Sequence, residues 1–303
     1  MQSFKACFVL VVLGAVCIQN AAAQDRLGAQ GAEAEPHRMQ QWRVPSPVID
    51  VAARAWLFRP RGDGPFRLAV IAHASTQNAL RRAQMPQPEY RALAAWLVAR
   101  GFAVLVPERP GHGGTGGRYL EDQGGCDEAN YISAGRATAD AIAAAAGFMR
   151  KQPFIRPDGM VIVGHSAGAW GALALAGQSP KEISAVIAFA PGRGSHANDQ
   201  PNEVCAPHTL MATAAEFGKT ARVPVTWLVA ANDTYFSPEL SRRMADAFRG
   251  GGGQVGSQVG FRVLPASGSE GHWLAETEAG VKIAGPELER ALRTPARGAA
   301  QKR

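Results

Sequence analysis

The sequence predicts an α/β fold in which a mostly parallel central sheet carries helices on both faces. Short apolar segments rich in Val, Ile, Leu and Ala alternate with segments whose apolar residues recur at helical spacing. The strand-like segments are apolar throughout rather than on alternate residues, which is typical of parallel strands buried on both faces. With 303 residues, the chain is long enough for one large domain with a substantial core.

The strands are expected where these apolar segments are short and bounded by Gly, Pro or polar residues. In chain order they are residues 53–58, 68–72, 103–106, 160–163, 185–189, 225–230 and 261–264. Helices are expected between them, at residues 90–100 (closed by Gly101), 133–150 (before Pro153), 167–176 and 238–248, the last with Ser237 as its N-cap. In such sheets the functional residues lie beyond the carboxyl ends of the strands, so the segments after each strand are the place to look for a site.

The amino terminus predicts an exported protein. Lys5, an apolar run of about 13 residues and the small residues 21–23 resemble a signal peptide, and the run is too short to span a bilayer. We therefore expect a signal peptide at 1–23 and no stable membrane insertion after its removal; a lipoprotein site at Cys17 is disfavoured because Val16 precedes it. Residues 24–48 are interpreted as a flexible leader and 49–293 as the α/β domain, with loop insertions at 108–132 and 191–220.

The net positive charge of the chain does not indicate a nucleic-acid partner. The formal net charge is +7, but the basic residues are scattered and no recognition motif accompanies them. Residues 294–303 read as a solvated basic tail. Nothing in the sequence indicates an oligomeric state.

Two cysteines remain after the predicted signal. Cys126 and Cys205 each lie in one of the two long loops, and an even pair in an exported protein favours a disulfide. The alternative is two free thiols packed as small apolar groups.

Ser166 is the candidate nucleophile. It lies in GHSAG, which matches the G-x-S-x-G nucleophile elbow, between an expected strand and an expected helix. The motif alone is weak in a chain with 34 glycines, so the flanking elements carry the interpretation. Gly164 and Gly168 leave room for the tight turn, and the helix N-terminus offers free N–H groups to a developing oxyanion.

The partners of an elbow serine follow it in the order acid, then histidine. Asp233 comes directly after the strand expected at 225–230, and His272 lies in the loop after the last strand. His272 would take the proton of Ser166 and Asp233 would fix the tautomer of His272. Glu270 and Asp246 are the alternative acids.

The oxyanion hole is expected to use two backbone amides, that of Ala167 and that of Ser75 in the loop after residues 68–72. His73 is then a structural loop residue. Two other histidines are weaker candidates for the base: His165 points away from its neighbour on a sharp turn, and His112 precedes the serine. We treat His112, Arg109 and Arg193 as substrate-pocket candidates. His112 could instead simply close the turn, and the arginines could bind a substrate carboxylate or brace the loops.

No cofactor or metal is predicted. The G-x-G-x-x-G match at 111–116 is separated from its strand by prolines and opens no helix, and residues 218–220 resemble only half of a phosphate-binding loop. No H-E-x-x-H or paired-cysteine ligand set occurs.

Five segments together, VIVGHSAGAW, VPERPGHGGTGG, IAFAPGRG, WLVAANDTYF and SEGHW, resemble the exported, dienelactone-hydrolase-like branch of the α/β-hydrolase superfamily over residues 50–275. The resemblance implies the α/β-hydrolase fold, with Ser166 as nucleophile, Asp233 as acid and His272 as base. Dienelactone hydrolases use a cysteine nucleophile, so dienelactone is not the expected substrate. His73-Ala74 also replaces the usual His-Gly, which affects the second oxyanion donor.

We therefore expect an exported serine hydrolase that cleaves a small-molecule carboxylic ester through an acyl-enzyme. A peptidase or amidase using the same three residues, and a non-catalytic binding protein of the same fold, are the alternatives.

Overall fold

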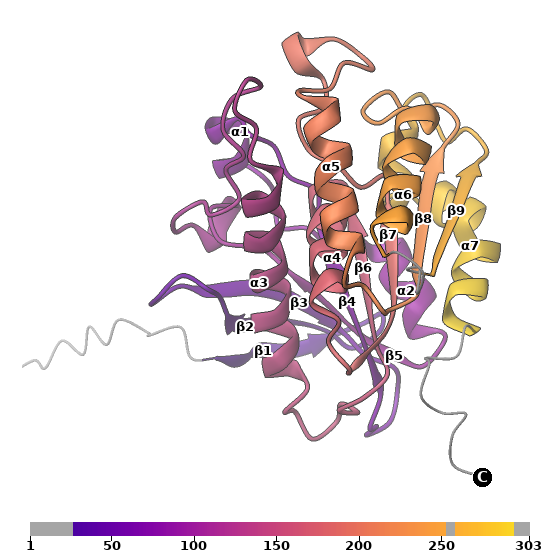
Figure 1. The fold of residues 1–303 in the computed structure, drawn as a ribbon. Coiled ribbons are helices and arrows are strands. Elements are labelled where there is room, and N and C mark those ends of the chain that lie inside the picture. Colours follow the sequence, from indigo (N-terminus) through magenta and orange to yellow (C-terminus); the bar gives the residue numbers. More distant parts are fainter. Residues whose placement is uncertain (1–26, 253–257, 294–303) are drawn as a thin grey trace, which may run out of the picture.

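The computed structural model describes residues 27–252 and 258–293, and within these ranges the chain forms a nine-stranded sheet with helices on both faces (Figure 1). The strands are β1 (Gly28–Ala34), β2 (Met39–Pro45), β3 (Ala52–Phe58), β4 (Arg67–Ala72), β5 (Phe102–Pro107), β6 (Met160–His165), β7 (Ile183–Phe189), β8 (Val225–Ala230) and β9 (Val259–Leu264). The helices are α1 (Ala79–Ala83), α2 (Arg91–Val98), α3 (Tyr131–Met149), α4 (Ala167–Gln178), α5 (Pro207–Gly218), α6 (Pro238–Gly251) and α7 (Glu278–Arg293).

The strand order is β1-β2-β3-β5-β4-β6-β7-β8-β9. The first three strands and β5 pair antiparallel, whereas every pair from β5–β4 to β8–β9 is parallel. The predicted, mostly parallel sheet is therefore confirmed. The parallel strands all end at one edge, which places the segments after β4, β6, β7, β8 and β9 side by side.

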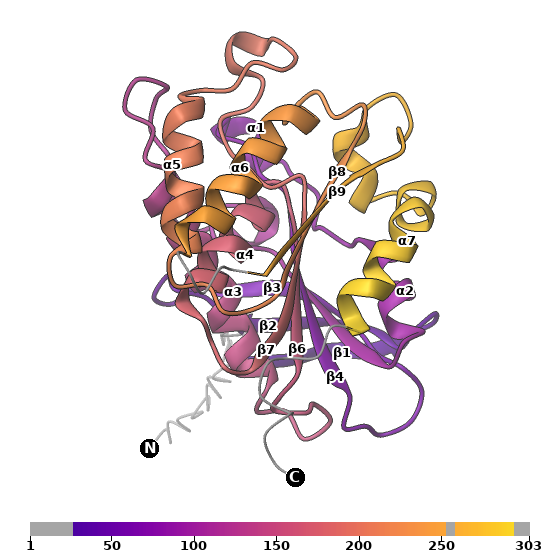
Figure 2. The same cartoon turned by 45° about the vertical axis from the view of Figure 1, so that its right-hand side comes forward.

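Two hydrophobic layers cover the two faces of the sheet. Along β4, Leu68 and Val70 face the layer formed with α3, α4, α5 and α6, whereas Ala69 and Ile71 face the layer formed with α2 and α7 (Figure 2). All four side chains are fully buried. Burial on both faces explains why these strands read as continuous apolar runs.

The structure corrects the interpretation of residues 24–48 as a flexible leader. From residue 27 onward this segment contains β1 and β2, and β2 pairs with β3 along its length. Trp42 and Val44 are buried, two residues apart, on one side of β2. A period-2 pattern is present, but the intervening Gln and Arg residues concealed it.

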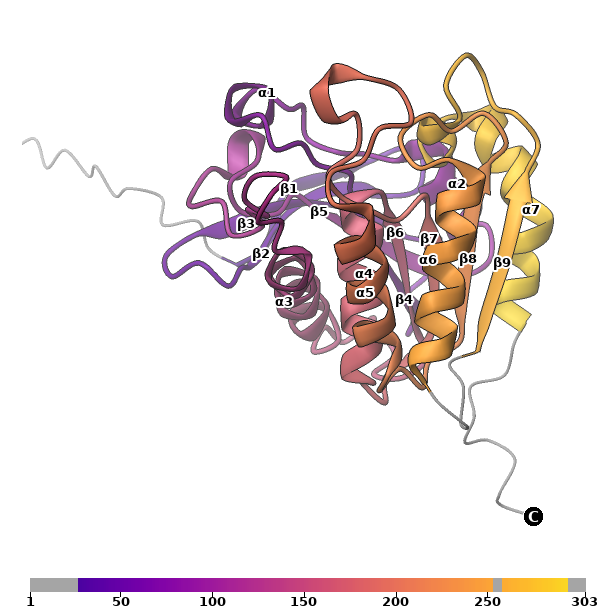
Figure 3. The ribbon, with the colours of Figure 1, turned by 45° about the horizontal axis from the view of Figure 1, so that its top comes forward.

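The loop expected at 191–220 is not irregular throughout, because its second half is α5. Pro207 occupies the first turn of α5, where the backbone N–H that proline lacks would have no partner within the helix. Leu210, Ala214 and Phe217 lie on one face of α5 and pack against the core. Residues 108–132 are irregular except for the short 3₁₀ helix η1 (Gly113–Thr115) and the start of α3. The irregular parts of both segments lie at the carboxyl edge of the sheet, whereas α5 runs along the sheet's face beside α4 (Figure 3).

The predicted signal peptide at 1–23 and the basic tail at 294–303 lie outside the described residues. No helix in the described ranges has the length and apolar character needed to cross a membrane.

Candidate active site

Ser166 occupies the predicted strand-to-helix turn between β6 and α4. Its backbone is left-handed in φ, with φ 54° and ψ −119°, a conformation in which a non-glycine residue is strained. The glycines on either side are required by close contacts. A Cβ at Gly164 would lie 2.3 Å from Ala169 Cα, and one at Gly168 would lie 2.1 Å from the carbonyl oxygen of Ala72. The sequence thus builds a sharp turn that presents Ser166 at the end of the sheet.

Asp233 and His272 are brought together by the loops after β8 and β9. His272 Nδ1 lies 3.2 Å from Asp233 Oδ2, and both side chains are buried. Asp233 Oδ1 accepts hydrogen bonds from the amides of Tyr235 and Phe236, at 2.8 and 2.9 Å. The carboxylate is therefore fixed in orientation, and it holds the proton of the imidazole on Nδ1, leaving Nε2 free to accept one.

Burial lowers the pKa of His272 below its ordinary value of 6.5, although the hydrogen bond and charge of Asp233 raise it. The ring of Tyr235 stacks on the imidazole at 4.1 Å between centroids, and the ring of His196 stacks on Tyr235 at 3.8 Å. This stack covers one face of His272. The imidazole is thus neutral at neutral pH, the state in which it can act as a base.

No hydrogen bond joins Ser166 Oγ to His272 within the described residues. The residue before the serine is in contact with His272, because the ring of His165 lies 5.1 Å from that of His272 and its Nε2 lies 2.8 Å from the His272 carbonyl oxygen. In proteins without bound substrate such a catalytic hydrogen bond is often long or absent, and it tightens when substrate arrives.

The two expected oxyanion donors lie in the wall of one pocket with Ser166. Ala167 begins α4, and Ser75 follows β4. The intervening amide of Ala74 is engaged, since it donates to the hydroxyl of Tyr90 at 3.1 Å. Ser75 therefore remains the candidate for the second donor. The start of α4 lies close against the end of β4, because a Cβ added at Gly168 would overlap the carbonyl of Ala72.

His112 lies behind this wall and does not line the pocket, contrary to the expectation. Its Nε2 is 2.7 Å from Ser75 Oγ, and its Nδ1 is 3.1 Å from the carbonyls of Arg109 and Pro110. Because those carbonyls only accept, Nδ1 carries the proton and Nε2 accepts from Ser75. Burial lowers the pKa of His112 to about 4, so the ring is neutral. It supports Ser75 rather than contacting substrate.

His73 is a structural residue, as expected. It is buried, its Nε2 accepts from the amide of Arg109 at 3.0 Å, and its Nδ1 donates to the carbonyl of Ala74 at 2.6 Å.

The two arginines converge on one buried carboxylate, Glu121. Arg109 is 1% exposed and binds Glu121 through Nε and Nη2, so it braces the loops and does not face the pocket. Arg193 contacts Glu121, Thr138 and Tyr119 through its terminal nitrogens, and unlike Arg109 it is among the residues that line the pocket. Glu121 had no signal in the sequence.

The two alternative acids have other partners. Glu270 accepts from the amides of His272 and Thr234, at 2.9 and 3.1 Å, and so joins the loops after β8 and β9. Asp246 pairs with Arg249 on the exposed side of α6. Neither takes the place of Asp233.

His165 is not placed as a base for Ser166. Its ring is buried, with Nδ1 2.9 Å from the Tyr90 hydroxyl and 3.2 Å from Glu276, and Nε2 2.8 Å from the carbonyl of His272. Tyr90 in turn bonds to Ala74, as described above. The sequence did not single out Tyr90 or Glu276, which link the loop after β4 to the loop that carries His272.

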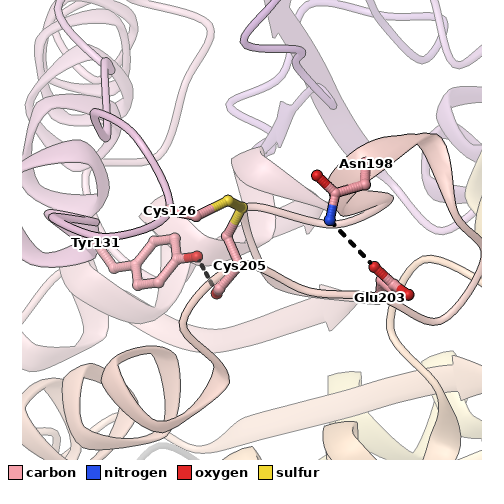
Figure 4. Close-up of a disulfide and its surroundings, with 5 residues drawn as sticks. All are labelled: Cys126, Tyr131, Asn198, Glu203 and Cys205. Atoms are coloured by element: carbon pink, nitrogen blue, oxygen red, sulfur yellow. Dashed lines mark hydrogen bonds between the residues drawn. A yellow bond between two sulfur atoms is a disulfide. The ribbon is translucent and has the colours of Figure 1, made fainter.

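Cys126 and Cys205 form the predicted disulfide, with their Cα atoms 4.7 Å apart (Figure 4). The hydroxyl of Tyr131 donates to the carbonyl of Cys205, and the amide of Cys205 donates to the carbonyl of Gly194 at 2.8 Å. The bridge therefore joins the segment before α3 to the segment that carries Arg193.

The glycine-rich stretch at 111–116 forms a closed turn. Gly111 N donates to the carbonyl of Gly116 at 2.6 Å, and Glu108 accepts from Thr115 N at 2.7 Å. The amides of Gly111 and Thr115 in this turn already donate to Gly116 and Glu108. In a dinucleotide-binding loop, such amides would face the pyrophosphate. In the described part of the chain, no cluster of three or more His, Cys, Asp or Glu side chains is arranged to hold a metal ion.

A pocket of about 1200 Å³ opens over Ser166. Its lining includes residues of the segment between β4 and α2, residues of the segment 192–199, and Tyr235, Trp273 and Glu276. The pocket is large enough to hold a small molecule.

The fold is shared with many solved structures. An acetyl xylan esterase from Thermoanaerobacterium sp. matches with TM-score 0.57 and 14% identity, over 88% of this chain and 87% of that one. A Klebsiella pneumoniae protein named as a dienelactone hydrolase matches with TM-score 0.56 and 14% identity, over 84% and 98%. The chain has the α/β-hydrolase fold.

Other comparisons point to different members of this fold. A puromycin-hydrolyzing peptidase from Mycobacterium tuberculosis matches this α/β-hydrolase domain with TM-score 0.54 and 16% identity, over 86% of this chain but 41% of its own. The sequence profile of the prolyl oligopeptidase family matches residues 88–193. No curated protein matches the chain.

Proposed function

We propose that the chain is an exported serine hydrolase that cleaves a carboxylic ester through an acyl-enzyme. The observation that carries the proposal is the strained strand-to-helix turn that places Ser166 in the lining of a pocket. The pairing of His272 with Asp233, on the loops after β9 and β8, supports it. The resemblance of the fold to esterases supports it. Export rests on the composition of residues 1–23.

In the proposed reaction, Ser166 Oγ attacks the ester carbonyl carbon while His272 Nε2 takes its proton. The amides of Ala167 and Ser75 donate to the oxyanion that forms. When the bond to the alcohol oxygen breaks, His272 returns the proton to the departing alcohol. Water then repeats the sequence on the acyl-enzyme, releasing the acid and free Ser166.

A peptidase or amidase is the second candidate, favoured by the match to the prolyl oligopeptidase family over residues 88–193. The same three residues could cleave an amide, since the chemistry differs only in the leaving group.

The test is a panel of short-chain esters and aminoacyl amides, run on the purified protein and on Ser166→Ala, together with labelling by a fluorophosphonate. We expect ester turnover and labelling that both disappear in Ser166→Ala. Turnover of the aminoacyl amides that disappears in Ser166→Ala would establish a peptidase or amidase, since a peptidase also cleaves the intrinsically more reactive esters. Turnover and labelling no greater than in Ser166→Ala would mean that the fold serves binding alone.

A further inference from the structure

Tyr90 has a strained backbone at a position where the fold alone does not require one. It precedes α2 with φ 49° and ψ 41°, in the left-handed region, and its side chain makes no capping bond to the helix. For a bulky residue this conformation is an outlier, and such strain persists where the surrounding contacts hold it in place. The side chain is buried, so its contacts lie within the candidate site.

The Tyr90 hydroxyl contacts three separate segments of that site. It accepts from the amide of Ala74 at 3.1 Å, lies 2.9 Å from Nδ1 of His165 and lies 3.3 Å from Oε1 of Glu276. Ala74 directly precedes Ser75, whose amide is the candidate second oxyanion donor. One hydroxyl therefore joins the oxyanion loop to the residue before the candidate nucleophile.

The contacts around His165 require one proton more than a neutral ring supplies. Its Nε2 carries a proton, since it lies 2.8 Å from the carbonyl oxygen of His272, and in a neutral ring Nδ1 then has none. Oε1 of Glu276 lies 3.2 Å from this Nδ1, although an ionised carboxylate only accepts. The single proton of the Tyr90 hydroxyl can satisfy just one of these two acceptors.

A second proton on the ring removes this conflict. With Nδ1 protonated, His165 donates to Glu276 and to the carbonyl of His272, and the Tyr90 hydroxyl also donates to Glu276. The hydroxyl oxygen is then free to accept from Ala74. Every polar atom of the group has a partner in this arrangement, which is what buried polar groups require.

The electrostatics of the group agree with a carboxylate beside a cation. Burial raises the pKa of Glu276, but its hydrogen bond to His165 and the charge of His165 outweigh this and lower the pKa below its ordinary value of 4.5. Burial raises the pKa of Tyr90 well above 10, so its hydroxyl keeps its proton. The ionisable side chains that face His165 are Tyr90, Glu276 and His272, and the charge of Arg109 also reaches Tyr90.

We propose that Tyr90 and Glu276 are positioning residues that act through a doubly protonated His165. Together they hold the oxyanion loop and the loop of His272 in register while the extra proton is present. The inference rests on the proposed hydrolase function and adds a pH-dependent control to its site. The side chain of Glu276 is 42% exposed and lines the pocket, so the proton can exchange with solvent.

The first measurement reads the protons directly, by nitrogen NMR of the chain isotope-labelled at histidine and kept at neutral pH. The resonances of His165 are assigned by their absence in His165→Leu. We expect both ring nitrogens to be protonated in the unchanged chain and only one in Glu276→Gln. A single protonated nitrogen in the unchanged chain would overturn the inference. This readout does not need turnover, so it is separate from a failure of the proposed function.

The second measurement is the pH dependence of kcat and KM for one short ester. Loss of the extra proton leaves two acceptors facing each other, so kcat of the unchanged chain should fall at alkaline pH. Glu276→Gln should keep most of kcat and flatten this alkaline limb, because its amide group can donate to a neutral Nδ1 at every pH. Glu276→Leu should lower kcat roughly ten- to a hundredfold, the cost of a misplaced catalytic group, with KM changed less.

Glu89→Gln is the matched control for the charge of Glu276. Glu89 also lines the pocket but pairs with Arg91, so its replacement should leave the alkaline limb in place. An alkaline limb that persists unchanged in Glu276→Gln would overturn the inference, as would one that Glu89→Gln flattens equally.

Tyr90→Phe removes only the hydroxyl and should lower kcat by a factor similar to that of Glu276→Leu. Tyr131→Phe is its control, because the buried Tyr131 hydroxyl donates to the carbonyl of Cys205 and its loss affects stability without touching His165. Equal kcat in the two variants would contradict the role of Tyr90. If Tyr90→Phe fails to fold, Glu276→Gln still decides, since that side chain is partly exposed.

Discussion

His165 Nε2 lies 2.8 Å from the carbonyl oxygen of His272, so the histidine that precedes the candidate nucleophile is tied to the backbone of the candidate base. A carbonyl oxygen only accepts, which means that Nε2 of His165 carries the proton. On its other side the ring meets Tyr90 and Glu276. His165 therefore acts as a positioning residue for the loop that carries His272.

Replacing His165 should impair turnover without abolishing it. In His165→Leu we expect kcat to fall roughly ten- to a hundredfold, the cost of a small misplacement of a catalytic group, with KM little changed. His272→Ala should lose about 10⁴-fold or more, as expected for removal of the base.

Steady-state kinetics on one short ester would separate these roles. His208→Leu is the matched control, since His208 is exposed on α5 and should be neutral. Equal losses in His165→Leu and His272→Ala would contradict the assignment of His165 to positioning.

The pH dependence of activity should report the buried imidazole of His272. Only the neutral form can take the proton of Ser166, so activity is present above the pKa of His272 and is lost as pH falls through it. Because burial lowers that pKa, the acid limb of kcat/KM should lie below pH 6.5.

The ring of Tyr235 is part of that burial, which gives the pH profile a structural test. In Tyr235→Leu, water reaches the face of His272 that Tyr235 covers. Its pKa should then rise toward 6.5 and the acid limb should move to higher pH. His196→Ala is the control, because His196 stacks on the other face of Tyr235. An acid limb that stays in place in Tyr235→Leu would refute this account.

Glu121 should be among the most sensitive positions for stability. It is the shared carboxylate of two buried arginines, Arg109 and Arg193. Glu121→Gln leaves both guanidinium groups without a counter-charge, and removing one partner of a buried pair costs about 3–5 kcal/mol of unfolding free energy.

Urea denaturation would measure the loss, with Glu216→Gln as the control. Glu216 pairs with Lys219 on the surface, where an ion pair contributes about 1 kcal/mol or less. A loss in Glu121→Gln as small as that of the control would show that the buried cluster is not structural.

The sequence predicted the parts of this site that depend on local pattern. Ser166 was proposed because a G-x-S-x-G motif lay between an apolar strand and an Ala-rich helix, and the structure places it on that turn. Asp233 was proposed because it follows a buried strand, which is β8. Their position at one edge follows from the parallel sheet. Glu121 could not be found this way, since its bond to Arg193 spans 72 residues and leaves no spacing rule.

Strand β2 and the side-chain directions of His112 and Arg109 were not predicted from the sequence, for two different physical reasons. In β2 the buried residues alternate with Gln and Arg. The polar composition of the segment therefore led to its interpretation as a flexible leader, although the period-2 pattern of a strand is present. His112 and Arg109 follow a strand, as functional residues do, but their side chains turn into the loops instead of the pocket. Side-chain direction at a strand end is set by long-range packing that the sequence does not show.

The Cys126–Cys205 bridge should stabilise the chain and preserve the pocket together. Mass analysis of the unreduced, digested protein should show the two cysteines linked; free thiols at both would contradict the structure. Because the bridge spans 79 residues, its loss should cost about 2–4 kcal/mol of unfolding free energy. The double variant Cys126→Ser/Cys205→Ser measures this loss without a reductant.

The same variant should also raise KM, because Cys205 bonds to Gly194 in the pocket wall. The loop after β9 lies outside the bridged segments, so kcat should change less than KM. A reductant serves as the control, since it should reproduce both effects in the unchanged chain and neither in the double variant. If the variant loses stability but keeps its KM, the bridge supports the fold without shaping the pocket.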